Sequence, residues 1–390
     1  MPRPSTVLCL NGGSSSLKFA IYQIDKGSEV RLAEGAAEEV GLPSARFWMR
    51  DSQGRMVADT SAGLHGTSEV VTLLLGALSR NGSAQFSAAG HRIVHGGPDY
   101  ASPQLVTPSL MLALKRFIPF APQHLPAQLE LVDAIGNAYP NLPQVVCFDT
   151  AVHRSMPELA GRFPLPRRLW DEGIRRYGFH GLSYEFILAS LGSAAGRRTI
   201  IAHLGNGASM VAVLDGVPID TTMGFTPSGG TMMGTRSGDL DPGILMYVLQ
   251  QKRYDAGTIQ RLVNDESGLL GVSASTSDMK TLLENRPTQP EAAQAVAMFC
   301  YQARKWIGAL SAVLGGLDML VFTGGIGEHA APVRYEICTG LEYLGVHISE
   351  EQNSRNAPVI SIPASPCTVR VIPTNEDLII ARHTRSVLER

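Results

Sequence analysis

Three glycine-rich turns are the parts of this chain best suited to hold an anion. They cover residues 11–16, 203–209 and 323–328, and each follows a short apolar run that is typical of a buried strand. Where a strand ends in glycines, backbone N–H groups can converge on an anion such as phosphate. One such turn would be weak evidence. Three of them, accompanied by Lys18 and several arginines, predict that the chain surrounds a polyphosphate such as ATP.

If the bound polyphosphate gives up a phosphoryl group, two arginines are the best candidates to act on it. Such a transfer spreads negative charge over three equatorial oxygens, so cations and N–H donors must surround the transfer point. Arg92 and Arg236 fit because a planar guanidinium can bind a carboxylate or a phosphoryl group through two parallel hydrogen bonds. For an arbitrary arginine, a salt bridge is the commoner role. The glycines and serines at 234–238 favour a functional role for Arg236, since they allow close backbone approach.

The elements that must position these groups begin with strands joined by short turns. Two sets of three strand-like runs follow the same plan: strand, glycine-serine turn, strand, turn with Asp and Gly, strand. The sets lie at residues 7–10, 17–24 and 29–33, and at residues 199–202, 210–214 and 217–219. This weak internal repeat predicts a duplicated domain with a site in the cleft between the copies. A chance similarity of two hairpins is the alternative.

Helical stretches lie between the strands. Apolar residues recur at helical spacing at 67–78, 126–138, 242–252 and 290–314. The third of these begins clearly, because Asp241 can cap it and Pro242 occupies its first position. A mixture of strands and helices of this kind is typical of α/β layers. We expect a domain boundary near Ala151.

Composition excludes several classes of protein. With 390 residues, of which 44% are hydrophobic, the chain can bury a large core, and a usual size of about 100–200 residues per domain predicts two domains. The net charge is −2 and no basic run occurs, so the sequence does not indicate a positively charged surface that would bind nucleic acid or anionic lipid. No apolar run suits a signal peptide or a membrane span. Five scattered cysteines fit reduced thiols. We therefore expect a cytoplasmic protein with small-molecule partners, without nucleic acid or membrane.

Eight motifs occur together in an order that points to one enzyme family. They are residues 10–19, 90–97, 147–151, 177–181, 203–209, 233–239, 323–328 and 373–376. In this combination they closely resemble the acetate kinase family. The resemblance extends from residue 7 to residue 380, which makes it far more specific than any single loop.

The resemblance implies an α/β fold of two duplicated ribonuclease-H-like domains, as in sugar kinases, heat-shock ATPases and actin, with a nucleotide cleft between them. The implied N-terminal actin-like domain, on the acceptor side, covers 1–151 and is completed by a C-terminal helix at 377–390. The implied C-terminal actin-like domain, on the nucleotide side, covers 152–376. The implied reaction is reversible, Mg-ATP-dependent phosphorylation of acetate to acetyl phosphate with release of ADP, by direct in-line transfer. A homodimer is also implied.

The resemblance assigns catalytic roles to Asp149, His180 and Arg236. Arg236 would hold the transferring phosphoryl group, and His180 would donate to the transition state. Without the resemblance, a hydrogen-bonded structural role would be favoured for this histidine. Asp149 is often drawn as a base, but a carboxylate acceptor is already ionised at neutral pH, since model carboxyl groups titrate near pKa ~4. We expect Asp149 to position Mg²⁺ and the acceptor instead.

Substrate, nucleotide and metal ligands follow from the same resemblance. Arg92 would hold the acceptor carboxylate, and the other implied substrate-binding residues are Val94, His124, Phe179 and Pro227. The implied nucleotide-binding residues are Ser14, Ser16, Lys18, His203, Leu204, Gly205, Asn206, Gly207, Asp278, Met279, Lys280, Gly325, Ile326, Gly327, Glu328 and His329. Asn11 and Glu376 would approach Mg²⁺, or Mn²⁺ in its place, through retained waters. Glu376 could equally be an acid in the first turn of a helix, where it suits the helix dipole.

Several residues depart from the family pattern. Lys280 and His329 stand where arginine and asparagine are usual, which leaves the preferred purine open. Gln123 replaces a leucine of the acyl pocket, so a kinase of propionate or another short carboxylate is the alternative, although Val94 favours acetate. Leu182 and Tyr184 replace the usual threonine and histidine after His180, and residues 227–231 replace a more acidic loop. An ATP-driven sensor of the same fold is a remote alternative, because it would not need Arg92, His124 and Phe179 together.

Overall fold

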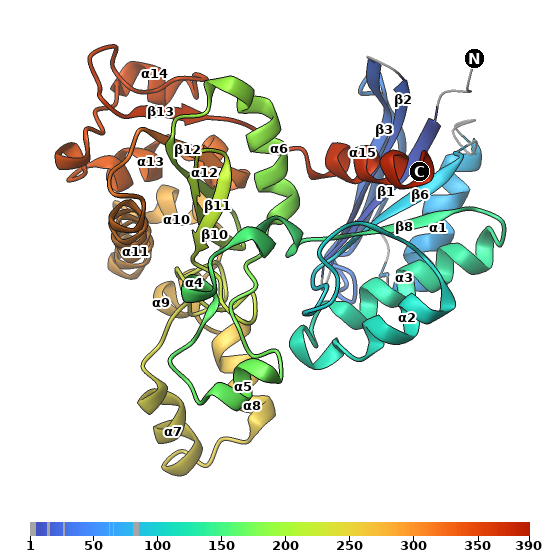
Figure 1. Cartoon of the computed structure of the whole chain (residues 1–390), viewed down its shortest axis with the longest axis horizontal. Coiled ribbons are helices and arrows are strands. Elements are labelled where there is room, and N and C mark those ends of the chain that lie inside the picture. The colour runs from blue at the N-terminus through green and yellow to red at the C-terminus, as the bar shows by residue number, and fades with distance from the viewer. Residues whose placement is uncertain (1–4, 14–15, 26–27, 62, 65, 81–85) are drawn as a thin grey trace. The chain divides into compact units, whose positions relative to one another are not determined.

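The computed structural model describes residues 5–13, 16–25, 28–61, 63–64, 66–80 and 86–390. The chain divides into two units, each with a sheet of its own (Figure 1). The first unit comprises Met1–Ala151 and Asn375–Arg390, and the second unit comprises Val152–Thr374. The C-terminal segment therefore belongs to the same unit as the N-terminal strands.

An eight-stranded sheet forms the centre of the first unit in its described part. Its strand order is β5-β4-β3-β2-β1-β6-β8-β7. β2 is antiparallel to both of its neighbours, β1 and β3, whereas β6 runs parallel to β1, and β8 runs parallel to β6. The strands are β1 (Ser5–Gly12), β2 (Leu17–Asp25), β3 (Ser28–Glu38), β4 (Arg46–Asp51), β5 (Met56–Ser61), β6 (Ala88–Ile93), β7 (Gln104–Leu105) and β8 (Gln144–Phe148).

Helices cover both faces of this sheet. They are α1 (Thr67–Arg80), α2 (Pro108–Lys115), the short 3-10 helix η1 (Ile118–Phe120), α3 (Leu125–Ala138) and α15 (Glu376–Leu388). Ala89 joins the apolar cluster formed with α1 and α3, whereas a Cβ at Gly90 would lie only 2.2 Å from Thr384 Oγ1 of α15. Because successive residues of a strand point to opposite faces, α15 lies on the face opposite α1 and α3.

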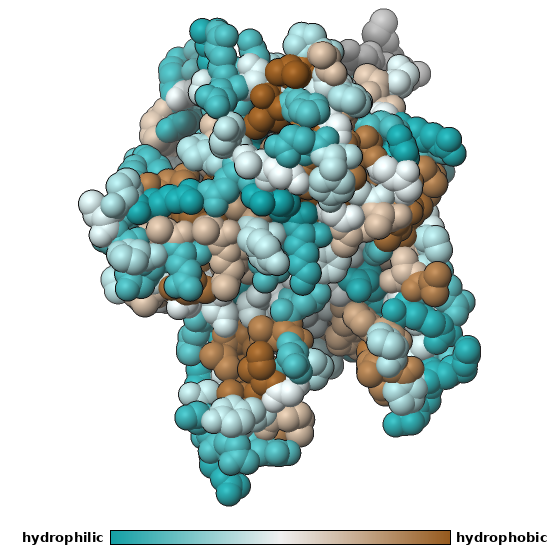
Figure 2. Space-filling view, turned by 90° about the vertical axis from the view of Figure 1, so that its left-hand side faces the viewer, coloured by the Kyte–Doolittle hydropathy of each residue, from teal (hydrophilic) through white to brown (hydrophobic). Residues whose placement is uncertain are grey.

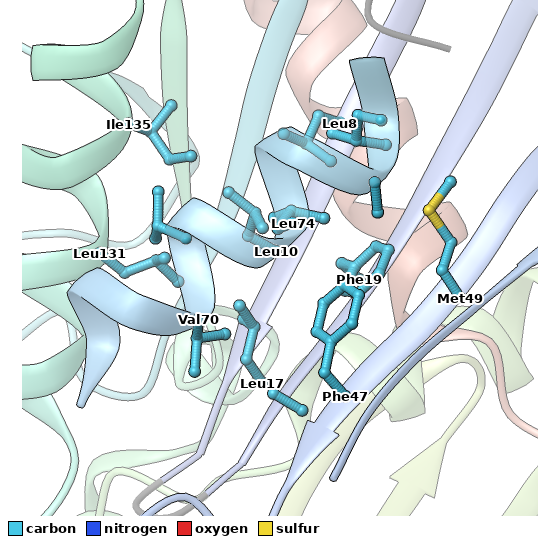
Figure 3. Packing of buried hydrophobic residues seen from close by; sticks show 14 of the residues in the cluster. Leu8, Leu10, Leu17, Phe19, Phe47, Met49, Val70, Leu74, Leu131 and Ile135 are labelled. Carbon is cyan, nitrogen blue, oxygen red and sulfur yellow. The ribbon is translucent and has the colours of Figure 1, made fainter. Parts of the chain in front are cut away.

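The core of the first unit lies between the sheet and α1. Figure 3 shows Leu10 and Phe19 of the sheet directed toward Leu74 of α1, with Leu131 of α3 beside them. The rings of Phe19 and Phe47 stack with centroids 5.7 Å apart. Burial of this apolar surface, at about 25 cal/mol per Å², fixes the strands whose ends carry the polar residues described below.

A five-stranded sheet forms the centre of the second unit, with the order β11-β10-β9-β12-β13. The strands are β9 (Arg198–Leu204), β10 (Ala208–Leu214), β11 (Val217–Thr221), β12 (Met319–Thr323) and β13 (Thr368–Val371). The α-helices are α4 (Glu158–Gly161), α5 (Arg167–Asp171), α6 (Gly181–Leu191), α7 (Pro242–Gln250), α8 (Ala256–Asn264), α9 (Gly268–Ser273), α10 (Met279–Asn285), α11 (Pro290–Leu314), α12 (Gly324–His329), α13 (Ala331–Cys338) and α14 (Glu350–Ser354). The 3-10 helices are η2 (Ala151–Ser155), which begins on the last residue of the first unit's N-terminal segment, η3 (Gly192–Ala194) and η4 (Glu342–Leu344).

The two sheets share one plan. In the first, β3-β2-β1 is an antiparallel meander to which β6 and β8 add in parallel. In the second, β11-β10-β9 is the corresponding meander, and β12 and β13 add in parallel in the same order. Identical order and direction in two separate segments confirm the duplication that the sequence repeat predicts, and the α/β class with it.

Most predicted elements are present, with one informative exception. The predicted strands and helices are confirmed, including the cap of α7, where Asp241 accepts a 2.7 Å hydrogen bond from Gly243 N–H. Residues 323–328 were expected to form a turn. Helix α12 instead begins in this segment, at Gly324. The Glu328 carboxylate accepts a hydrogen bond from Gly324 N–H at 2.9 Å, which closes the first helical turn despite its glycines. Strands β4 and β5 were not predicted.

The surface of the described residues is mixed in polarity. Figure 2 shows hydrophobic side chains reaching the surface among hydrophilic ones. Within the described ranges, no helix is both long enough and apolar enough to cross a bilayer. The five cysteines are buried free thiols, as expected.

Candidate active site

A buried ion pair anchors the site residues of the first unit. Arg92, on β6, donates from Nη2 to Asp149 Oδ2 at 2.8 Å, and Asp149 directly follows β8. The Asp149 side chain is fully buried, whereas 13% of the Arg92 side chain is exposed. Burial acts to lower the pKa of Arg92, but the charges of Asp149 and Glu376 outweigh it and raise the pKa above its ordinary value. Arg92 is therefore a fixed cation whose side chain is partly exposed.

An amide connects this ion pair to the C-terminal helix. Asn11, at the end of β1, donates from Nδ2 to Glu376 Oε2 at 2.7 Å and accepts from Arg92 Nη1 at 3.4 Å. Asn375 caps α15 by accepting from Leu378 N–H, so Glu376 is the first residue of a capped helix. The interpretation of Glu376 as a helix-start acid is confirmed. The same geometry places Glu376, Asn11, Arg92 and Asp149 in one continuous network.

One polar residue of this region has no counterpart in the sequence prediction. Gln128, on α3, is only 1% exposed, donates to the Gly12 carbonyl at 2.7 Å and accepts from Val94 N–H at 2.8 Å. It therefore ties the first glycine turn to the residue that follows β6. Its signal in the sequence is a glutamine in the apolar stripe of a predicted helix, where an amide needs buried partners.

The remaining predicted site residues of the first unit are spread over several of its elements. Val94 is buried, and His124 is the half-buried N-cap residue of α3. Ser16 accepts a hydrogen bond from Gly13 N–H through its carbonyl at 2.7 Å, which closes the turn, and Lys18 is exposed on β2. Ser14 lies outside the described residues.

In the second unit, two side chains converge on one glycine of the β9–β10 turn. An added Cβ at Gly207 would lie 2.8 Å from Arg236 Nη2 and 3.2 Å from His180 Nε2. Arg236 also donates from Nη1 to the Pro227 carbonyl at 2.6 Å, which orients the guanidinium. The absence of a side chain at Gly207 thus allows a cation and an imidazole edge to approach the same backbone segment.

The backbone around this point is closely connected. His180 has the left-handed conformation, with φ 57° and ψ 29°, which is uncommon for a residue other than glycine. The preceding residue, Phe179, is buried, and its carbonyl lies 3.0 Å from His153 Nε2. Gly205 N–H donates to the Gly207 carbonyl at 3.0 Å, and the Asn206 carbonyl accepts from Gly234 N–H at 2.9 Å. The second glycine turn and the loop that carries Arg236 are therefore hydrogen-bonded to each other.

The predicted nucleotide residues beyond this turn lie on two other elements. Asp278 is the N-cap of α10, and hydrogen bonds from the Thr281 hydroxyl and backbone N–H lower the pKa of its carboxyl. Met279 is buried and Lys280 is exposed. On α12, Gly325 and His329 are exposed, Ile326 is half-buried and Gly327 is buried, while Glu328 accepts from Gly324 N–H and from Thr374 N–H at 3.0 Å. His203 and Leu204 end β9.

The predicted metal ligands, Asn11 and Glu376, contact each other directly. The described residues hold no cluster of three or more His, Cys, Asp or Glu side chains suited to a metal. Glu376 offers one carboxylate, and Asn11 binds it through Nδ2. Burial, and then the charge of Glu376, raises the pKa of the neighbouring Asp377 to about 7, so at neutral pH Asp377 adds only part of a second charge. One or two carboxylates combined with substrate phosphates is the usual way in which proteins bind Mg²⁺.

The fold and the two sets of residues define a class of α/β protein with two duplicated units, each of which carries its own group of polar and charged side chains. A sequence profile of the acetokinase family matches residues 6–382. The chain is 44% identical to an acetate kinase of Rhodopseudomonas palustris over 389 residues, covering 97% of each chain. Among solved structures it is similar to Porphyromonas gingivalis acetate kinase, with 37% identity, a TM-score of 0.87 and coverage of 98% and 100%. A propionate kinase from Francisella tularensis gives 34% identity, a TM-score of 0.91 and the same coverage. The chain belongs to the acetokinase family.

The position of Gln128 leads to a first prediction. Gln128→Leu keeps much of the side-chain volume but leaves the Gly12 carbonyl and Val94 N–H without partners, and each buried polar group left unpaired costs about 1–3 kcal/mol. We expect a clear loss of unfolding free energy, measured by urea denaturation of the whole chain. Asn137→Leu, the same kind of change at an exposed position of α3, should leave the midpoint nearly unchanged. Equal midpoints for the two variants would contradict the structural role of Gln128.

Proposed function

We propose that the chain is an acetate kinase that transfers the γ-phosphoryl group of Mg-ATP reversibly and directly to acetate, giving acetyl phosphate and ADP. The observation that carries this proposal is the convergence of Arg236 Nη2 and His180 Nε2 on the Gly207 backbone. A cation and an imidazole edge held around a side-chain-free turn form a site for a group whose charge grows on its peripheral oxygens. Membership of the acetokinase family supports the same reaction.

The first unit supplies the group that would bind the acceptor. Asp149 and Asn11 engage only part of the five N–H donors of Arg92, and part of the side chain is exposed. The Nη hydrogens that these contacts leave over would bind a carboxylate, whereas Nε is buried, and the fixed charge would offset the repulsion between acetate and the phosphoryl group. Acetate is ionised at neutral pH, so attack needs no base. Asp149 already accepts a charge-assisted hydrogen bond from Arg92, which supports a positioning role for it.

The second unit supplies the groups that would bind the phosphoryl group. Arg236 would donate to the phosphoryl oxygens from the edge that is not bound to the Pro227 carbonyl. His180 would donate to them from Nε2. The backbone of residues 203–207 would hold the adjacent phosphates, with Asn206 near the transferred group. Lys18 and Ser16 are the nucleotide-binding candidates of the first unit. Mg²⁺, held by Glu376 and Asn11 through waters, would neutralise phosphate charge when bound.

The choice of acceptor is the finer part of this proposal. Val94 and Phe179 are buried apolar residues suited to a short acyl chain. Gln123 is half-buried and polar, and a related structure is that of a propionate kinase, so propionate is the second candidate. We favour acetate because Val94 limits the space for a longer chain.

Two further properties belong to the proposal. Helix α7 exposes Ile244, Met246, Tyr247 and Leu249, and no residue of this helix is buried, which supports a surface covered by a second copy in a homodimer. Free thiols fit a reducing compartment, which supports a cytoplasmic location.

A trapping assay tests the function. The chain is incubated with Mg-ATP and hydroxylamine in the presence of acetate, propionate, butyrate, glycolate or no acid. We expect hydroxamate and ADP to form together and only with an acid, with acetate giving the highest kcat/KM. The same comparison ranks propionate. Equal ADP release in every tube, with nothing trapped, would instead identify an ATPase.

Arg236→Ala tests the transition-state role of the guanidinium. Loss of one donor that acts mainly in the transition state lowers kcat by roughly 10²–10³ fold. We expect that loss together with a nearly unchanged dissociation constant for ATP, measured by calorimetry. Arg197→Ala is the matched control, because Arg197 is 72% exposed and pairs with Asp215 at the surface. An unchanged kcat in Arg236→Ala would remove this residue from the reaction.

A further inference from the structure

A line of hydroxyl groups lies behind the ring of His180. The Tyr184 hydroxyl lies 2.5 Å from Ser209 Oγ, and Ser209 Oγ lies 2.8 Å from His180 Nδ1. The opposite edge of the same ring, Nε2, faces Gly207 and Arg236. The hydroxyls therefore act on the edge of the imidazole that points away from the proposed phosphoryl site.

The apolar surroundings leave the two hydroxyl groups dependent on these hydrogen bonds. Tyr184 and Ser209 are both fully buried. The Tyr184 ring packs in an apolar cluster with residues of α6, β9, β10 and β12, which are Ile187, Leu191, Ile201, Val211, Val213, Met319 and Val321. A buried hydroxyl that loses its partner in such a place has no water to replace it. The hydrogen positions are thus set by the protein groups themselves.

The acidities of the three groups determine the direction of the line. A phenol, with a usual pKa of about 10, is a much stronger hydrogen-bond donor than an alkyl hydroxyl. The Tyr184 hydroxyl therefore donates to Ser209 Oγ, and the Ser209 hydroxyl donates its single hydrogen to His180 Nδ1. A neutral imidazole that accepts at Nδ1 carries its hydrogen on Nε2. The result is an N–H donor directed toward Gly207.

We propose that Tyr184, acting through the Ser209 hydroxyl, is a positioning residue that fixes His180 in the tautomer with its hydrogen on Nε2. The catalytic use of that tautomer rests on the proposed function, since an Nε2–H donor suits a phosphoryl oxygen that gains charge. His203 keeps the ring in plane, because the two imidazoles stack with centroids 4.2 Å apart at 19°. His203 is in turn held by the Ser183 hydroxyl, 2.9 Å from its Nδ1.

The test is a measurement of the tautomer in Tyr184→Phe, which keeps the ring and removes only the hydroxyl. The chain is labelled with ¹⁵N-histidine, and His180→Gln assigns the signal of His180 among the ten histidines. In the unaltered chain we expect Nδ1 at a pyridine-type shift and Nε2 at a pyrrole-type shift. In Tyr184→Phe the two shifts should move toward each other, as both tautomers become populated. Ser209→Ala should produce the same change by breaking the line at its centre.

Kinetics and a matched control complete the test. We expect kcat of Tyr184→Phe to fall roughly 10–100 fold, the size of effect seen when a partner that orients a histidine is lost, with little change in KM for ATP. Tyr177→Phe removes another buried phenol hydroxyl, 2.8 Å from the Gly173 carbonyl, and should leave the shifts of His180 unchanged. Unaltered His180 shifts in Tyr184→Phe would overturn the proposal. The tautomer is read without substrate, so its change in a chain that forms no acyl phosphate would refute the proposed function alone.

Discussion

The second unit is organised by a steric constraint at Gly207. Any side chain there would occupy the space in which Arg236 Nη2 and His180 Nε2 approach the β9–β10 turn. Contacts on either side keep this space open. Arg236 donates a hydrogen bond to the Pro227 carbonyl, and Gly234 N–H, in the same loop, donates to the Asn206 carbonyl. The left-handed backbone conformation of His180 sets the direction of its ring. Left-handed backbone at a bulky residue is strained, and packing of the surrounding sheet and helices must compensate for it.

The first unit holds the guanidinium of Arg92 in a largely buried position. Taking an arginine out of water is costly unless its charge is paired and its hydrogen bonds are satisfied. Asp149 supplies the charge, and Asn11 relays the network to Glu376 on the C-terminal helix. β1 and β6 are parallel neighbours, as are β6 and β8, and α15 packs against all three strands. Residues from four distant parts of the sequence therefore reach one place. The duplicated strand plan thus recurs in two units, each of which gathers its own set of charged and polar side chains.

Much of this arrangement is visible in the sequence. Apolar runs followed by glycine turns predict the strands whose ends carry the site, and their repetition predicts the duplication. The resemblance supplies Arg92, Asp149, His180 and Arg236, because their motifs are local. Gln128, Ser209 and Tyr184 escape prediction, since their roles depend on hydrogen bonds between residues far apart in the chain. Residues 323–328 were expected to form a turn because glycines disfavour a helix. The start of α12 is stabilised by the Glu328 carboxylate, which accepts a hydrogen bond from Gly324 N–H.

The central claim is that a carboxylate oxygen attacks phosphorus. The most direct measurement is ³¹P NMR of the product formed from Mg-ATP and acetate labelled with ¹⁸O in both carboxylate positions. The account predicts that the acyl phosphate resonance shifts upfield by the increment of a single ¹⁸O bonded to phosphorus, because the bridging oxygen comes from acetate. Unshifted inorganic phosphate as the only new product besides ADP would show that water is the acceptor, and would contradict the account.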